Sequence, residues 1–420
     1  MSAFDKIIGY EPIKEELRQL CDMMHHGNIY EKLGAKMPKG LLFHGEPGTG
    51  KTLMAHSFIQ ESGRKAYIIR RNKPTGDFID EIKRVFSEAA DNAPSIILLD
   101  DMDKFVVEED GKEEYIAVQA CIDGLNDADV YVISTANDLY SFPDSLLRAG
   151  RFDRKICVDL PEGDDAAKII QHYISSKSVE NDLCVEDITK MLNGKSCADL
   201  ETLLNEAAIY AGFERCNKIT MEHIVRSVLR NEYGASKSVL AVDNERLEAI
   251  AYHEAGHVVV SELQLPYSTG LASLCTRSDR NGLGGFVVRC ADPKSSMQNV
   301  PILLAGNAAT ELKFGITTEG GSDDIRRAIE KVKESVVYNA GCGIGVADIF
   351  RCYQQVSNDL RARQELIIQT EIERFATQAK QMLAENMVFL DTVAAALLEK
   401  ETLLHSDIRK LRESMLKETA

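Results

Sequence analysis

The stretch GEPGTGKT at 45–52 constrains the fold of this 420-residue chain more than any other feature. It matches the pattern G-x-x-x-x-G-K-[ST] and directly follows the apolar run GLLFHG at 40–45, which is typical of a buried strand. A glycine-rich turn between a strand and a helix lets backbone N–H groups surround phosphate oxygens, while Lys51 reaches the β- and γ-phosphates and Thr52 holds Mg²⁺. We expect the whole loop to bind nucleotide: Gly45, Glu46, Pro47, Gly48, Thr49, Gly50, Lys51 and Thr52.

Four further apolar runs repeat the pattern of this strand within the first 160 residues. They are AYIIR (66–70), SIILLD (95–100), VYVIST (130–135) and KICVDL (155–160). Helical patterns separate them, as expected for a parallel sheet covered on both faces. From 161 to 233 the strand signals end, and ADLETLLNEAAIYAGFE has helical periodicity. The sequence therefore predicts an α/β nucleotide-binding domain over 1–160 and a small helical domain over 161–233.

Polar residues at the ends of the predicted strands complete the nucleotide site. Asp100 ends a buried strand, where an aspartate can hold magnesium opposite the phosphate loop. Asp101 and Asp103 follow it and can instead be solvated carboxylates at the start of a helix. Asn137 follows VYVIST and can position the attacking water, or it can simply form a turn. Arg148 and Arg151 in LLRAGRFDR are candidate arginine fingers to a γ-phosphate, and surface ion pairing is the other interpretation.

The stretch AYHEAGHVVVSEL at 251–263 contains H-E-x-x-H within a pattern that predicts a continuous helix. His253 and His257 then lie on one helix face, where both can bind one Zn²⁺, and Glu254 can act as general base on the attacking water. The alternative is a buried helix with hydrogen-bonded histidines. A catalytic zinc needs a third protein ligand. Asp323 and Asp324 in GGSDDIRRAIEKV are both candidates, and N-capping is the other role for either.

The region 234–420 is expected to be mostly helical, with a linker near NEYGASKSV (231–239), a strand near GLGGFVVRC (282–290) and long helices from about 358 to 413. The net charge of −17 argues against the basic surface that a nucleic-acid-binding protein needs. No apolar run approaches the roughly 18–20 residues that span a bilayer, and the N-terminus has no signal-peptide pattern. The ten scattered cysteines indicate a reducing compartment, so we expect a cytoplasmic protein without a membrane segment.

Taken in order, these motifs make the chain similar to FtsH-type AAA+ zinc metalloproteases. The resemblance extends from about Phe4 to the final helices and is also carried by GAKMPKG (34–40), LLRAGRFDR (146–154), CADLETLLNEAA (197–208) and GGSDDIRRA (320–328). It implies an α/β AAA+ domain with a parallel sheet, a helical lid, and a mostly α-helical zinc metalloprotease domain over 234–420. It also implies that Asp324 is the third zinc ligand and that GLGGFVV (282–288) is an edge strand that pairs with substrate.

The resemblance further implies ATP, Mg²⁺ and Zn²⁺ as cofactors, polypeptides as substrates, and a homohexameric ring that unfolds chains and feeds them to the peptidase. Three departures bear on these expectations. Asp101 stands where the family has a glutamate that activates the attacking water. Its side chain is one methylene shorter, so its carboxylate lies roughly 1.5 Å short of the usual position, and we expect slow ATP turnover. The stretch NKPTGDF (72–78) corresponds to the family's central pore loop and has Pro74 at the position of the family's aromatic residue. Phe78 could take the place of that aromatic. The family's membrane anchor is absent, which implies either a relative without one or a chain that begins after it.

These observations support two functions. The first is an ATP-dependent zinc endopeptidase that acts on unfolded or loosely folded polypeptides. The alternative is a slowly hydrolysing, nucleotide-switched binding or remodelling module with little proteolysis. A third interpretation, a scaffold with a closed structural zinc site, is disfavoured because two histidines and one aspartate leave a position for water.

Overall fold

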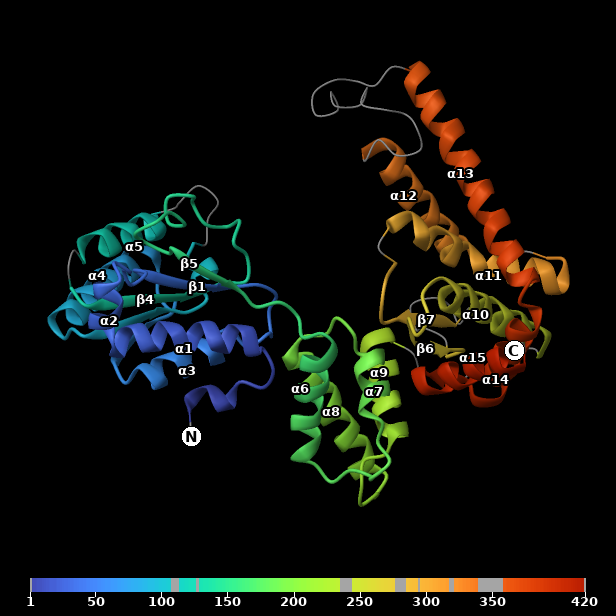
Figure 1. Cartoon of the computed structure of the whole chain (residues 1–420), viewed down its shortest axis with the longest axis horizontal. Coiled ribbons are helices and arrows are strands. Elements are labelled where there is room, and N and C mark those ends of the chain that lie inside the picture. The colour runs from blue at the N-terminus through green and yellow to red at the C-terminus, as the bar shows by residue number, and fades with distance from the viewer. Residues whose placement is uncertain are drawn as a thin grey trace. The chain divides into compact units, whose positions relative to one another are not determined.

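The computed structural model of the chain (Figure 1) describes residues 2–106, 113–125, 128–234, 244–275, 285–293, 295–316, 321–338 and 358–418. Two compact units are present. The first comprises Met1–Ser176 with Gly194–Thr202, and the second comprises Lys177–Asn193 with Leu203–Ala420. The domain limits at 160/161 and 233/234 stay predictions.

The first unit contains a five-stranded sheet in the order β2-β3-β4-β1-β5, and every neighbouring pair is parallel. The strands are β1 (Gly40–His44), β2 (Lys65–Ile69), β3 (Ser95–Leu99), β4 (Val130–Thr135) and β5 (Arg154–Cys157). The helices are η1 (Ala3–Lys6), α1 (Glu11–His25), α2 (Gly27–Lys32), α3 (Lys51–Ser62), α4 (Thr75–Asp91), η2 (Met102–Lys104), α5 (Glu113–Gly124) and α6 (Gly163–Ser175). The predicted parallel α/β sheet is confirmed.

Helices cover both faces of this sheet, with α1 and α3 on one side and α4 and α5 on the other (Figure 1). Ile97 and Leu99 of β3 pack with Phe78 and Phe86 of α4 in one core cluster, whereas the intervening Leu98 points to the opposite face. All five residues of β3 are buried. Each apolar side chain removed from water in this way contributes about 1.5–3 kcal/mol, which explains the uninterrupted apolar runs of the sequence.

The second unit begins with the helices α7 (Val185–Met191) and α9 (Met221–Tyr233), and the helix α8 (Cys197–Phe213) runs from one unit into the other. The remaining helices are α10 (Asn244–Gln264), η3 (Ser296–Gln298), α11 (Asn299–Phe314), α12 (Ser322–Tyr338), α13 (Asn358–Ala384), α14 (Met387–Lys400) and α15 (His405–Glu418). One core cluster of this unit joins α10, α11, α13 and α14. The mostly helical character expected for this region is confirmed.

A three-stranded antiparallel sheet, in the order β7-β6-β8, lies beside these helices. Its strands are β6 (Thr269–Ser273), β7 (Phe286–Arg289) and β8 (Thr402–Leu404). We predicted β7 from its apolar run, and it forms one edge of the sheet. We missed β8, which interrupts the predicted C-terminal helices, because its pairing partner β6 lies about 130 residues earlier and leaves no local signal.

Among the described residues, no single helix is both long and apolar enough to cross a bilayer. One pair, Arg361–Ala384 and Met387–Lys400, meets that test of length and composition only when taken together across an 83° bend.

Candidate active sites

The phosphate loop connects β1 to α3, as its motif requires. Gly45, Gly48 and Gly50 have φ angles of 131°, 76° and 97°, a region that glycine adopts far more readily than other residues. The Lys51 Nζ donates to the carbonyl oxygens of Gly45 and Glu46 at 2.8 and 2.7 Å. Burial lowers the pKa of Lys51, although nearby carboxylates act in the opposite direction. The loop is thus shaped to present backbone N–H groups and one ammonium to an anion.

A cavity of about 540 Å³ opens beside this loop, a size that accommodates a nucleotide. Its polar wall combines the loop from Pro47 to Thr52 with Asp101, Lys104 and Asn137. Apolar side chains of the N-terminal segment and of α6 form much of the remainder, including Ile7, Ile8 and Ile169. All of these residues belong to the first unit. The cavity therefore offers a charged region for phosphates and an apolar region for a base.

Asp100 lies at the carboxyl end of β3, directly beside the phosphate loop. The hydroxyls of Thr52 and Thr135 donate to its Oδ1 at 3.0 and 2.6 Å, and the Arg70 Nε donates to its Oδ2 at 2.6 Å. Burial alone would raise the pKa of Asp100, but these hydrogen bonds outweigh it and lower the pKa. An ionised carboxylate next to a threonine hydroxyl is the arrangement that holds Mg²⁺ at nucleotide sites.

Asp101 lines the same cavity, and its backbone and side chain both form hydrogen bonds. Its backbone is left-handed, with φ of 54°, and its amide donates to the Thr135 Oγ1 at 2.9 Å. Its Oδ2 accepts a hydrogen bond from the Lys104 Nζ at 2.8 Å. The backbone N–H of Asn137 donates to Asp103 at 3.1 Å, which ties the ends of β3 and β4 together. The structure thus brings Asp100, Asp101 and Asn137 to one edge of the sheet.

The two candidate arginine fingers do not line this cavity within the described part of the chain. Arg151 makes two hydrogen bonds of 2.8 Å to the carboxylate of Asp123 on α5, and this pairing raises the pKa of its guanidinium. Arg148 is exposed. Neither arginine is brought to the nucleotide site of its own chain.

The stretch expected to form the central pore loop has no exposed aromatic. Pro74 is the N-cap of α4 and begins the helix there. Phe78 is fully buried and packs edge-on against Phe105, with 4.9 Å between the ring centroids. The suggestion that Phe78 substitutes for the missing aromatic is therefore wrong, because its apolar side chain completes the core between α4 and the sheet.

His253 and His257 both lie on α10 and are almost completely buried. Their rings are arranged edge to face, with 3.2 Å between the two Nε2 atoms. Each Nε2 also lies 3.3 Å from the Oδ2 of Asp324, which enters from the first turn of α12. Asp323 instead pairs with Arg326 at 2.5 Å. Of the two aspartates that the sequence left open, Asp324 is the one that joins the histidines.

The spacing of these three ligand atoms fits zinc. Zn²⁺ binds imidazole nitrogen and carboxylate oxygen at about 2.0–2.2 Å in tetrahedral geometry, which separates neighbouring ligand atoms by roughly 3.3 Å. The separations of 3.2, 3.3 and 3.3 Å among His253, His257 and Asp324 match the edges of such a tetrahedron. Three protein ligands leave the fourth position for water or substrate, as in catalytic rather than structural zinc sites.

The neighbours of His257 orient its ring so that Nε2 faces the metal-ligand group. Its Nδ1 lies 2.7 Å from the carbonyl oxygen of Ile302, which can only accept, so the ring donates there and Nε2 faces the site. Without a metal, Asp324 raises the pKa of His257 to about 9, although burial alone would lower it. Burial alone would raise the pKa of Asp324, but hydrogen bonds with His253 and His257 hold it well below its usual range. Zinc would replace the proton shared by these groups.

Gly306 of α11 permits this arrangement, because it faces the two imidazoles. A Cβ at this position would lie 2.5 Å from the Nε2 of His253 and 2.6 Å from the Nε2 of His257. Both distances are far below van der Waals contact. Only glycine lets α11 approach α10 without displacing the two nitrogens.

Glu254 lies between the histidines in sequence and is 4% exposed. Gly285, which directly precedes β7, packs against its side chain, since a Cβ there would fall 2.8 Å from the Glu254 Cγ. The candidate general base and the edge strand of the small sheet are therefore neighbours. The residues 282–284 of the predicted edge segment lie outside the described part of the chain.

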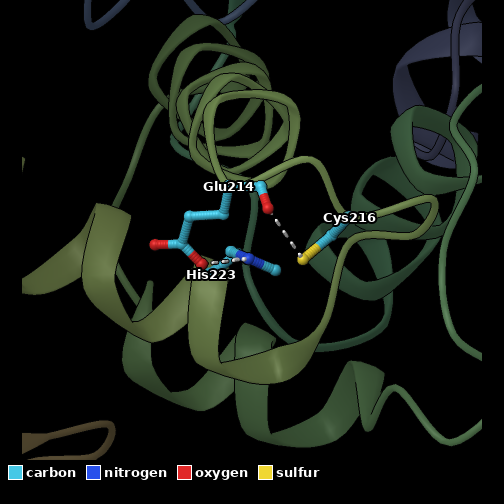
Figure 2. Close-up of side chains that lie close together, drawn as sticks. All are labelled: Glu214, Cys216 and His223. Atoms are coloured by element: carbon cyan, nitrogen blue, oxygen red, sulfur yellow. Dashed lines mark hydrogen bonds and ion pairs between the residues drawn. The ribbon is translucent and has the colours of Figure 1, made fainter.

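A second group of metal-ligand side chains, Glu214, Cys216 and His223, gathers where α8 ends and α9 begins (Figure 2). The His223 Nδ1 accepts from the backbone N–H of Thr220 at 3.0 Å, so a neutral ring carries its proton on Nε2. That nitrogen lies 3.2 Å from the Glu214 Oε2 and donates to it, and Arg226 pairs with the other carboxylate oxygen. Because Nε2 is occupied by its proton, these contacts describe a helix cap rather than a metal site.

Two family models match the chain. Residues 41–160 match the ATPase family associated with various cellular activities (AAA), and residues 239–411 match peptidase family M41. The fold and the two sites thus define an AAA ATPase domain joined to a zinc-type metallopeptidase domain.

The chain is similar along nearly its whole length to named relatives. It is 30% identical to the ATP-dependent zinc metalloprotease FtsH of Leptotrichia buccalis, over 97% of this chain and 56% of that protein. It is 29% identical to FtsH 3 of Symbiobacterium thermophilum, over 98% of this chain and 71% of that protein. Both its AAA region and its M41 region thus resemble those of FtsH-type ATP-dependent zinc metalloproteases. The chain spans 56% of the length of the first relative and 71% of the second.

The two matched families and the group of His253, His257 and Asp324 imply ATP, Mg²⁺ and Zn²⁺ as ligands. Sequence reasoning missed three residues that shape the sites: Arg70, Thr135 and Gly306. Arg70 and Thr135 had a usable signal, because each lies at the carboxyl end of a strand adjacent to β3, and the carboxyl ends of neighbouring parallel strands meet. Gly306 had no such signal in the sequence. Glycine is required there because of close packing against α10, a helix more than forty residues away in sequence.

Proposed function

We propose that this chain is an ATP-dependent zinc endopeptidase that acts on unfolded or loosely folded polypeptides. The observation that carries the proposal is the tetrahedral spacing of His253, His257 and Asp324 beside Glu254. A complete phosphate loop in the same chain supplies the ATP dependence. The proposal rests on these residues and on the family that the chain resembles.

In this proposal His253, His257 and Asp324 hold zinc. When bound, zinc acidifies a water molecule and polarises the scissile carbonyl. Glu254 takes the proton of the attacking water and returns it to the leaving amine. The edge strand β7 binds the substrate backbone in extended form and keeps the scissile bond near Glu254. At the other site, Lys51 and the loop N–H groups bind the phosphates of ATP, while Thr52 and Asp100 hold Mg²⁺.

We further propose that the chain works as a homohexameric ring, in which Arg148 or Arg151 reaches the nucleotide of a neighbouring subunit. Support comes from their position away from the cavity of their own chain. The mass of the particle with ATP and Mg²⁺ tests this proposal. A hexamer is expected, and a monomer under these conditions would contradict it.

The direct test of the peptidase is metal content combined with cleavage of a short unstructured peptide. One zinc per chain and cleavage that a chelator abolishes are expected. A zinc-loaded protein that leaves the peptide intact would contradict the proposal and would favour the second candidate function, a nucleotide-switched binding or remodelling module. The specific observation in favour of that alternative is the pairing of Asp101 with Lys104, which occupies one oxygen of the Asp101 carboxylate.

Replacement of Asp101 by glutamate is expected to accelerate steady-state ATP hydrolysis about tenfold or more. The longer side chain moves the carboxylate roughly 1.5 Å further toward the attacking water, into hydrogen-bond reach. The measurement is phosphate release by wild type and Asp101→Glu at saturating ATP. A wild-type rate already typical of ATPases, or a variant no faster than wild type, would contradict the proposed limitation.

Tightly folded substrates are expected to resist this enzyme, because no exposed aromatic occupies the described pore-loop stretch and Phe78 is buried. A reporter protein with a stable fold and an unstructured tail should lose its tail while its folded part persists. The same reporter, destabilised by substitutions in its core, should be degraded completely. Rapid ATP-dependent loss of the stable reporter would show that another element grips the chain.

A further inference from the structure

Three lysines line the nucleotide cavity, Lys6, Lys51 and Lys104, and the phosphate-loop motif accounts for only Lys51. Lys51 belongs to the phosphate loop, and Lys104 ends η2, the short helix that follows β3. Lys51 and Lys104 line the cavity together with Thr52, Asp101 and Asn137. Phosphate binding by the loop therefore leaves the ammonium group of Lys104 without an assigned role.

The connection from Thr52 to Asp100 shows which part of the nucleotide Lys104 would meet. Their hydrogen bond of 3.0 Å fixes the carboxyl end of β3 against the first turn of α3. Lys51 and Thr52 of that turn serve the β- and γ-phosphates and their magnesium. Lys104 lies four residues beyond Asp100 on the same segment, whereas the apolar residues suited to the base come from the N-terminal segment and α6. Lys104 is thus on the terminal-phosphate side of the cavity.

Asp101 holds Lys104 in place without consuming its binding capacity. The Lys104 Nζ donates one hydrogen bond to the Asp101 Oδ2, at 2.8 Å. An ammonium has three donors, so further N–H groups can point to a phosphate. This hydrogen bond, together with the charges of Asp101, Asp103 and Asp100, raises the pKa of Lys104, which keeps the ammonium charged. The side chain of Lys104 is 64% exposed, so a ligand in the cavity can reach it.

We propose that Lys104 binds the terminal phosphate of ATP and makes this cavity prefer ATP to ADP. This inference rests on the proposed function and deepens it. Loss of the γ-phosphate on hydrolysis removes the partner of Lys104 and leaves the ammonium with Asp101. The hydrogen bond between Lys104 and Asp101 keeps the ammonium beside the terminal phosphate and supports retention of ATP.

The test is equilibrium binding of ADP and of a non-hydrolysable ATP analogue, each with Mg²⁺, to the full chain. Lys104→Met keeps most of the length of the side chain and removes its charge. Its affinity for the ATP analogue should fall on the order of tenfold, the effect of one hydrogen bond to a charged group. Its affinity for ADP should change by less than about twofold, which also shows that the variant is folded. Lys104→Arg should keep most of the preference of wild type.

Lys83→Ala is the matched control. Lys83 forms an exposed pair with Asp80 three residues earlier on α4, so its removal deletes the same kind of ion pair outside the cavity. Wild-type affinity for both nucleotides is expected. Equal losses of ATP-analogue and ADP affinity in Lys104→Met, or no loss of either, would overturn the inference alone. Failure of wild type to bind either nucleotide would overturn the ATPase assignment together with it.

Discussion

Glu254→Gln is expected to bind zinc like the wild-type chain and to cleave an unstructured peptide about 10²–10⁴-fold more slowly. The amide has nearly the shape of the carboxylate but cannot accept the proton of the attacking water. Its neighbours His253 and His257 supply the ligand nitrogens, and Glu254 supplies none of the three ligand atoms. The variant therefore separates metal binding from proton transfer.

The measurement for this variant is kcat for a fluorogenic peptide, with zinc per chain determined on the same sample. Glu245→Gln is the matched control, because Glu245 is an exposed residue near the start of the same helix α10. It should retain both zinc and activity. Loss of zinc from Glu254→Gln would mean that Glu254 acts on the metal site itself, and undiminished cleavage would remove it as the general base.

Gly306→Ala is expected to weaken zinc binding by about 10–100-fold, although alanine favours helices. The added methyl group would lie 2.4–2.6 Å from atoms of both imidazoles, so either the rings rotate away from Asp324 or α11 moves away from α10. Both responses break the tetrahedral spacing. Peptide cleavage should fall in proportion to the zinc lost.

The control for Gly306→Ala is Gly212→Ala. Gly212 also lies within a helix, α8, but a Cβ there meets no atom within 4 Å. This control should keep its zinc and unfold at the same or a slightly higher temperature, because alanine stabilises a helix by about 0.5–1 kcal/mol relative to glycine. Zinc titration and thermal unfolding of both variants check the pair. Wild-type zinc affinity in Gly306→Ala would contradict the packing argument.

The parallel sheet and the two sequence motifs could be predicted because their signals are local. A buried strand such as Ser95–Leu99 is apolar throughout, and both the phosphate loop and H-E-x-x-H place their functional residues within eight positions. The strand Thr402–Leu404 could not be predicted, since its existence depends on pairing with β6. The requirement for glycine at 306 depends likewise on the distance between two helices.

The choice between Asp323 and Asp324 shows the same limit within the zinc site. Both residues start α12, and either carboxylate suits a metal or a helix N-terminus. The family resemblance pointed to Asp324, and the structure gives a physical reason, because only its carboxylate meets the two imidazoles while Asp323 pairs with Arg326. For Phe78 the structure rules out the role that the sequence suggested. Its place in the sequence allowed a role in the pore, but the core of the α/β unit buries it.

In the proposed function, ATP binding at one site drives proteolysis at the other. This coupling is tested most directly by the rate at which the zinc-loaded chain degrades a long unfolded polypeptide, with and without ATP. ATP should accelerate degradation by wild type, and Lys51→Ala should abolish that acceleration while both proteins cleave a short peptide at the same rate. This result would connect the phosphate loop to proteolysis by the site of His253, His257 and Asp324. Equal rates with and without ATP, or no cleavage by the zinc-loaded protein, would contradict ATP-dependent proteolysis by this chain.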